Sequence, residues 1–134
     1  MHEDVLPTLR QLAGLPVKGR GARRAFLRVA PRLFDLVMLD PPRWAKTPFG
    51  AVDVVRDYPS LLKPAMLCTR PGGWLFATHH VPDVDRAELV RVAERTAQKI
   101  GRRLDDVEVL GPDPDFPSPE GCEPALKILL ARVG

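Results

Sequence analysis

The chain has 134 residues, of which 45% are hydrophobic and 28% charged, and its formal net charge is +3. This length and composition indicate one globular domain with a real core and exclude a wholly disordered chain. No apolar run approaches the ~20 residues of a membrane helix, and the first residues, MHEDVL, do not resemble a secretory signal. We therefore expect a soluble cytoplasmic protein. The two cysteines, Cys68 and Cys122, fit no disulfide framework and are expected to be free thiols.

Charge is distributed unevenly along the chain. The segment from Gly14 to Leu33 contains six cations and no acid, whereas the segment from Asp105 to Glu123 contains seven acids and no cation. A basic segment favours nucleic acid as a partner because its side chains release counterions from phosphates, although most such segments are solvated loops. Within the basic segment 18–32, the cations expected to contact RNA are Arg20, Arg23 and Arg24.

The first third of the chain predicts a short helix and a buried strand. Residues Asp4 to Ala13 read as a helix, since Asp4 can cap it and its apolar residues share one face. A basic loop follows, with a brief helix around Ala25 to Val29. The nearly continuous apolar run from Phe34 to Leu39 predicts a strand buried on both faces of a parallel sheet. Asp40-Pro41-Pro42 ends that strand abruptly.

The rest of the chain predicts alternating helices and strands, closed by a strand pair. A loop over 43–53 precedes a helix around Leu61 to Leu67, which tolerates Pro59 and Pro64 only in its first turn or at a bend. A turn over 70–73 leads into the next strand, and the following helix is capped by Asp85. The last two strands leave no room for a crossover helix and are expected to pair antiparallel. The expected elements are a strand at 74–79, a helix at 85–100 that stops at Gly101, and strands at 107–110 and 126–133.

This order of elements predicts an α/β fold: the carboxyl half of a Rossmann-like doubly wound sheet, with parallel strands and a closing antiparallel hairpin. Ligands of such sheets bind outside the carboxyl ends of the strands, where Asp40-Pro41-Pro42 and the segment Thr78, His79, His80 both lie. Two successive prolines fix the backbone and hold the Asp40 carboxylate and nearby carbonyls outward, as a rim that could orient a planar substrate. The alternative interpretation is an ordinary turn after a strand.

Four ordered blocks carry a resemblance to a known family: FDLVMLDPPRWAK, DYPSLLKPAMLCTRPGGWL, the strand ending in THH, and DPDFPSPEG with ALKILLARV. In this order they resemble the class I S-adenosylmethionine-dependent methyltransferases, and most closely the large-subunit ribosomal RNA methyltransferases of the RlmI and RlmK type. The resemblance implies S-adenosylmethionine as cofactor and RNA, ribosomal RNA above all, as partner. It implies that Asp40, Pro41 and Pro42 border the methyl-donor and substrate site, and that Asp4 approaches the adenine of the donor.

The chain departs from that family in two respects. The family's glycine-rich loop and ribose-binding acid have no counterpart, since Gly19-Arg20-Gly21 follows no strand and reads as a basic loop. We therefore expect residues 1–134 to form a partial domain that lacks its amino-terminal donor-binding half and is incomplete alone. Ala77 occupies the place of the nucleophilic cysteine of cytosine-5 enzymes, so we expect transfer to a base nitrogen, which needs no thiolate. Arg43, directly after the two prolines, weakens an assignment to adenine amines specifically.

Three further residues are candidates for substrate contact. Trp44 could stack on a base or serve in packing, and either His79 or His80 could face the substrate or make a backbone hydrogen bond at the rim. Because adjacent residues of a strand point to opposite faces, the two histidines do not form a metal site, and none is expected. The main alternative function is a non-catalytic remnant or RNA-binding module that uses segment 18–32. A methyltransferase for protein or a small molecule is a third possibility.

The strand from Phe34 to Leu39 also predicts self-association. It is expected to pair with the strand that begins at Trp74, while its other edge has no partner in the predicted half-sheet. An unpaired apolar edge is a template for another chain, unless the helix from Asp4 to Ala13 or the basic loop folds over it.

Overall fold

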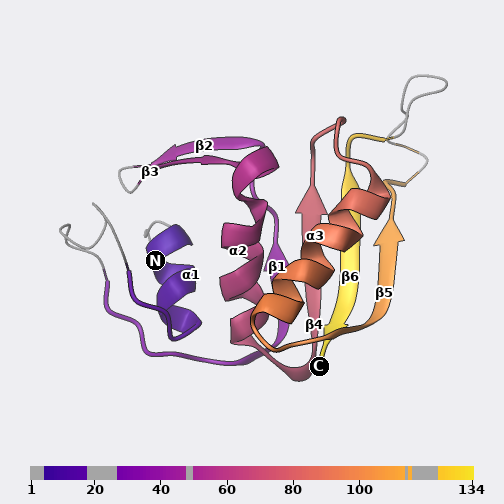
Figure 1. The fold of residues 1–134 in the computed structure, drawn as a ribbon. Helices are drawn as coiled ribbons and strands as arrows, with labels where there is room; N and C mark the ends of the chain where they lie inside the picture. The colour runs from indigo at the N-terminus through magenta and orange to yellow at the C-terminus, as the bar shows by residue number, and fades with distance from the viewer. Residues whose placement is uncertain (1–4, 18–26, 48–49, 114, 116–123) are drawn as a thin grey trace.

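The computed structural model describes residues 5–17, 27–47, 50–113, 115 and 124–134 as an α/β fold (Figure 1). The helices α2 and α3 lie on one face of a four-stranded sheet, and α1 lies beside α2, beyond the edge of the sheet. A separate two-stranded hairpin over residues 44–53 lies beside the helices. Among the described residues, no helix combines the length and the apolar character that crossing a membrane would need. The elements are α1 (Val5–Leu12), β1 (Phe34–Leu39), β2 (Trp44–Thr47), β3 (Gly50–Asp53), α2 (Val54–Cys68), β4 (Thr69–His79), α3 (Arg86–Lys99), β5 (Leu104–Leu110) and β6 (Lys127–Val133).

The sheet has the strand order β1-β4-β6-β5. β1 pairs with β4 in parallel, whereas β6 is antiparallel to both of its neighbours, β4 and β5. The predicted parallel pairing of the strands at 34–39 and 74–79 is therefore confirmed, as is the antiparallel closing pair. The sheet is mixed, and it matches the predicted parallel half-sheet only in this β1–β4 pair.

Alternation along the strands separates the two faces of the sheet. On β6, Leu129, Ala131 and Val133 are fully buried beneath the helices, while the residues between them are partly exposed. On α2, Leu62 and Met66 are fully buried against the same sheet face. The core thus lies between the sheet and α2 with α3, and each fully buried large side chain there contributes about 1.5–3 kcal/mol.

The two prolines of α2 do not lie in its first turn, which was one of the two places expected for them, the other being a bend. Pro59 and Pro64 both lie inside the helix and beyond its first turn. Each removes a backbone donor and disfavours a helix interior by about 3 kcal/mol. The buried residues Leu62, Ala65 and Met66, all fully shielded from solvent, supply packing that overrides this local preference.

Two further predictions, a loop and a brief helix, also differ from the structure. Residues 43–53 contain the antiparallel hairpin β2–β3, in which Trp44 pairs with Asp53 and Thr47 with Gly50, rather than a loop. This short hairpin lacks the alternation of apolar and polar residues that marks a half-buried strand. The brief helix expected around 25–29 is absent over residues 27–29, which have no regular structure, while 25–26 lie outside the described residues.

The strand β4 begins at Thr69, five residues before the predicted start at Trp74. The segment read as a turn carries a shift in register between β1 and β4, and Gly72 has a φ of +79°, which favours glycine. A Cβ atom at Gly73 would lie 2.9 Å from the carbonyl oxygens of Arg70 and Asp35, so only glycine fits there. The prediction of a turn at 70–73 was therefore wrong: these residues lie inside β4, at an irregularity in its pairing with β1.

The helix α3 forms as its capping signals predict. The Asp85 side chain accepts a hydrogen bond of 2.7 Å from the Glu88 backbone N–H. Gly101 adopts a φ of +69° directly after the helix, the left-handed conformation expected of a stop signal. Cys68, at the end of α2, is a buried free thiol as expected, and Cys122 lies outside the described residues.

Candidate functional site

The carboxyl ends of β1 and β4 meet at one edge of the sheet. The two strands are parallel, and Leu39 at the end of β1 lies opposite Ala77 of β4. Asp40, the next residue of the first strand, therefore lies beside Thr78. The structure thus brings together two of the segments singled out from the sequence, at the edge where α/β sheets bind ligands.

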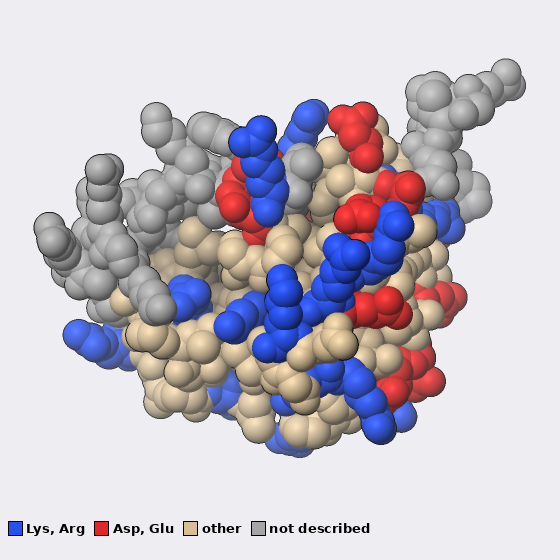
Figure 2. All heavy atoms as spheres, in the orientation of Figure 1, with Lys and Arg blue, Asp and Glu red and all other residues tan. Residues whose placement is uncertain are grey.

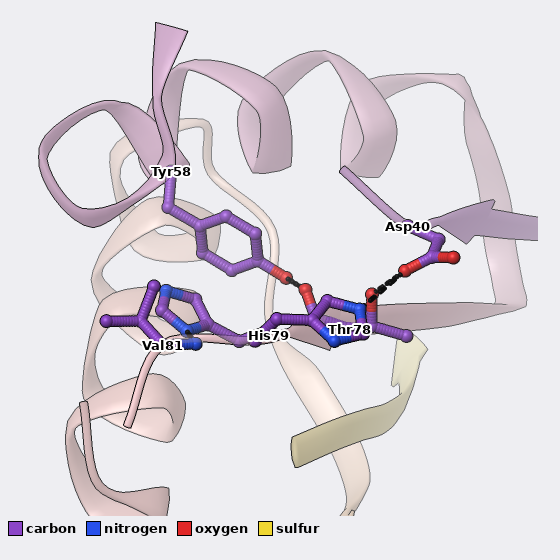
Figure 3. Close-up of polar contacts among 6 residues, drawn as sticks. Asp40, Tyr58, Thr78, His79 and Val81 are labelled. Atoms are coloured by element: carbon purple, nitrogen blue, oxygen red, sulfur yellow. Dashed lines mark hydrogen bonds and ion pairs between the residues drawn. The ribbon is translucent and has the colours of Figure 1, made fainter. Parts of the chain in front are cut away.

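Asp40 accepts two hydrogen bonds on a single carboxylate oxygen. Thr78 Oγ1 donates to Asp40 Oδ1 (Figure 3). His80 Nε2 lies 3.0 Å from the same oxygen. Both side chains stay accessible, since that of Asp40 is 68% exposed and that of His80 43%. No other described residue donates to Oδ2, so this oxygen faces outward as an open acceptor.

The surroundings of Asp40 keep it ionised. The hydrogen bond from Thr78 is the main cause that lowers the pKa of Asp40, the bond from His80 lowers it further, and slight burial opposes both. At neutral pH the group is therefore a carboxylate, which accepts hydrogen bonds and attracts cations. Pro41 and Pro42 follow directly, and because proline has no backbone N–H, neither can donate a hydrogen bond to this carboxylate.

His79 points to the opposite face from His80, as strand alternation predicts. It is 2% exposed, its ring meets the Tyr58 ring edge to face at 4.8 Å, and its Nδ1 accepts from the Val81 N–H at 3.3 Å. The Tyr58 hydroxyl in turn donates to the Thr78 carbonyl oxygen at 2.7 Å (Figure 3). Burial raises the pKa of Tyr58 well above its usual value, with a smaller effect from Asp40, so Tyr58 remains a neutral donor. His79 thus makes the backbone bond weighed in the sequence and lies in the core.

Two buried residues near this edge were not anticipated. Tyr58 joins α2 to the end of β4, and Lys127 lies opposite His79 on β6. Lys127 is 1% exposed, and its Nζ donates to the carbonyl oxygens of Val81 at 2.9 Å and Ala125 at 3.3 Å. A lone tyrosine in a helix and a lysine at a strand start give no sequence signal of burial, because both residues are usually exposed or half-exposed.

A small hollow lies beside this buried group. It has a volume of about 140 Å³ and is lined by residues of α2, the end of β4 and α3, among them Arg56, Tyr58, His79 and Glu88. Sites for small molecules usually measure roughly 300–1,000 Å³. The hollow is therefore too small for a nucleoside-sized ligand, and the open acceptor of Asp40 is the stronger candidate for ligand contact.

The remaining predicted site residues are not placed by the structure. Asp4, Arg20, Arg23 and Arg24 lie outside the described residues. Trp44 is the first residue of β2, but its side chain is not described, so its stacking role stays a prediction.

Known proteins resemble this chain in fold. No protein-family model and no curated protein matches it. Among solved structures, SMU.776, a candidate methyltransferase in complex with SAH, is 20% identical with a TM-score of 0.61, over 75% of this chain and 26% of that protein. The fold resembles part of a methyltransferase. A second structure, a candidate SAM-dependent methyltransferase from Streptococcus mutans, gives 19% identity and a TM-score of 0.57 over the same shares. The chain spans about a quarter of the length of these structures.

Proposed function

We propose that the chain supplies the carboxyl half of a class I S-adenosylmethionine-dependent methyltransferase domain that acts on a base nitrogen of ribosomal RNA. The observation that carries this proposal is the ionised Asp40 at the carboxyl ends of β1 and β4, held by Thr78 and His80 with one oxygen open. The resemblance of the DPP block and the fold match to part of a methyltransferase support the same assignment.

The described residues fit one edge of a donor site. Asp40 offers a fixed negative charge and an open acceptor, both suited to a cationic donor that carries N–H and O–H groups. The small hollow beside His79 does not enclose such a donor, so the rest of its surface needs groups beyond those described. When bound, S-adenosylmethionine supplies an electrophilic methyl group.

Asp40 would act by orientation. Its Oδ2 accepts a hydrogen bond from an N–H of the substrate base, while Thr78 and His80 fix the carboxylate through Oδ1. The backbone carbonyls of Pro41 and Pro42 offer further acceptors along the same rim. Alignment of a nitrogen lone pair with the methyl group then needs no covalent intermediate on the enzyme.

The cysteine chemistry of the described residues favours nitrogen over carbon as the methylated atom. Ala77, fully buried on β4, has no nucleophilic atom. Cys68 is 1% exposed, and burial raises the pKa of its thiol, so it is neither accessible nor a thiolate at neutral pH. Methylation of cytosine at carbon 5 requires a thiolate that attacks the ring, and these two residues cannot provide it.

Calorimetry with S-adenosylmethionine tests the half-site proposal. We expect the chain alone to bind the donor more weakly than the low micromolar range, because it supplies only one edge of the site. Adding a donor-binding half in trans should restore binding and transfer of labelled methyl groups to ribosomal RNA. Low-micromolar binding by the isolated monomer would contradict the proposal.

RNA binding without catalysis is the second candidate function, and a surface feature favours it. Figure 2 shows Lys and Arg side chains gathered over α2 and α3. The two helices contain six cations and three acids. Lys63, Arg95 and Lys99 are exposed and form no ion pair with any described residue, which suits contact with phosphates.

Salt dependence of RNA binding tests this candidate. Replacing Lys63, Arg95 and Lys99 with alanine should weaken binding and flatten its salt dependence by about one unit of slope for each lost contact. The same change at Arg20, Arg23 and Arg24 tests the segment predicted from the sequence. Arg70→Ala is the control, because Arg70 is already ion-paired with Asp35 at 2.6 Å. If the salt dependence of RNA binding is unchanged in both triple variants, these cations do not contact RNA and are simply solvated.

A further inference from the structure

The sheet pairing of β4 stops one residue before His80. In the register between β4 and β6, the last paired residue is His79, which lies opposite Lys127. On the other side of β4, the pairing with β1 ends at Ala77. In the described part of the chain, sheet pairing therefore does not reach His80, although the His80 ring makes one of the two hydrogen bonds to Asp40. The position of His80 must depend on other contacts.

The residue after His80 is held by two buried side chains. His79 Nδ1 accepts a hydrogen bond from the Val81 backbone N–H at 3.3 Å (Figure 3). Lys127 Nζ donates to the Val81 backbone carbonyl oxygen at 2.9 Å. His79, Val81 and Lys127 are each at most 2% exposed. Since a buried backbone group that loses its partner is costly, these two hydrogen bonds fix the backbone at Val81.

These two side chains are themselves anchored on the elements that flank the end of β4. Because His79 and Lys127 are directly paired, their side chains point to the same face of the sheet. The His79 ring packs edge to face on Tyr58 of α2, and Lys127 Nζ also donates to the Ala125 carbonyl oxygen at 3.3 Å. The backbone at Val81 is thus tied to α2 on one side and to the start of β6 on the other.

We infer that Lys127 and His79 are positioning residues of the Asp40 site. By fixing the backbone at Val81, they hold the preceding residue, His80, where its Nε2 lies 3.0 Å from Asp40 Oδ1. Their hydrogen bonds to Val81 go to backbone atoms, so their effect on the carboxylate passes through His80. The use of this arrangement for a ligand rests on the proposed function, whereas the positioning itself is a property of the free chain.

The exposure of His80 explains why such support matters. Its side chain is 43% exposed, and that of Asp40 is 68% exposed. A contact between two exposed side chains gains little, because water screens it and both side chains lose rotamer freedom when they hold one geometry. A fixed backbone at the neighbouring residue lowers that entropic cost for His80. The buried residues thus supply the order that the surface contact lacks.

Carbon-13 NMR of the Asp40 carboxyl in single variants gives the first test. After the hydrogen bond from Thr78, that from His80 is the next cause that lowers the pKa of Asp40, so His80→Phe should raise this pKa. Lys127→Met removes Nζ from a side chain of similar length and should raise the pKa of Asp40 by no more than His80→Phe does. Arg103→Met is the control, because Arg103 is an exposed cation at the opposite end of the sheet and should leave this pKa unchanged. Far-UV circular dichroism verifies that each variant is folded.

A double-mutant cycle separates positioning from a direct effect of the lysine charge. If Lys127 acts through His80, adding Lys127→Met to His80→Phe should cause no further rise in the pKa of Asp40. His79→Phe gives an independent variant, since it keeps an aromatic ring against Tyr58 but removes the acceptor for the Val81 N–H. It should raise the pKa of Asp40 in the same way and also add nothing to His80→Phe, and it decides the matter if Lys127→Met does not fold.

Two outcomes would overturn the inference. An Asp40 pKa that stays at its wild-type value in folded Lys127→Met or folded His79→Phe would show that these residues support the fold alone. A further rise when either change is added to His80→Phe would show that they act on Asp40 without His80. No methyl donor enters these measurements, so a wild type that fails to bind S-adenosylhomocysteine would contradict the proposed function and not the positioning.

Discussion

At the scale of single residues, Asp40 receives both of its hydrogen bonds on one oxygen. Thr78 and His80 come from the end of the neighbouring strand and hold the carboxylate in place while Oδ2 stays open. Tyr58, on α2, holds the end of β4 by donating a hydrogen bond to the Thr78 carbonyl oxygen. The site is thus a charged acceptor on a rigid support, which suits orientation of a ligand more than nucleophilic chemistry.

Replacing Thr78 with valine tests this arrangement. The Thr78 hydroxyl is the main cause of the lowered pKa of Asp40, so Thr78→Val should raise that pKa towards its usual value. A carboxyl with a lowered folded pKa stabilises the fold above its unfolded pKa and loses that contribution as pH falls through the folded pKa. Stability of the variant should therefore depend less on pH in the acidic range.

Carbon-13 NMR of the Asp40 carboxyl across the acidic range measures this change directly. Thr78→Ser is the matched control, because it keeps the hydroxyl and should keep the lowered pKa. An Asp40 pKa that is the same in Thr78→Val as in the wild type would show that the hydroxyl does not set it.

At the scale of elements, the sequence predicted those parts whose signals are local. The strand β1, the capping aspartate of α3 and the paired strands β5 and β6 formed where they were expected. The predicted burial of β1 on both faces was wrong, because Leu36 is 53% and Met38 67% exposed. The course of α2 through Pro59 and Pro64 could not be predicted, because burial against the sheet overrides the preference of proline. The hairpin β2–β3 escaped prediction because it is short and lacks alternation.

The capping of α3 gives a prediction at this scale. Asp85→Ala removes the side chain that accepts from the Glu88 N–H, so it should lower the free energy of unfolding by about 1 kcal/mol. Asp83→Ala is the control, since Asp83 is an exposed aspartate of the same loop without this contact. Urea denaturation compares the two variants, and equal losses would rule out capping as the source of stability.

At the scale of the whole molecule, the sequence was enough to predict which edge of the sheet carries the candidate site. It was not enough to predict the contacts between distant segments that build the site. Asp40 and His80 could be placed there because each follows the end of a strand. The burial of His79 against Tyr58, and of Lys127 on β6, depends on contacts between distant segments that no local pattern records. The donor-binding role of Asp4 and the RNA contacts of Arg20, Arg23 and Arg24 stay predictions.

The central claim is that the Asp40 edge belongs to a methyl-donor site. The most direct measurement is NMR of the nitrogen-15 labelled chain during titration with S-adenosylhomocysteine in large excess, which detects weak binding residue by residue. We predict shifts confined to the amides around Asp40, Thr78 and His80, lost in Asp40→Asn and kept in Asp35→Asn, an exposed acid of the same strand. No shifts at any ligand concentration, or shifts that persist in Asp40→Asn, would contradict the claim.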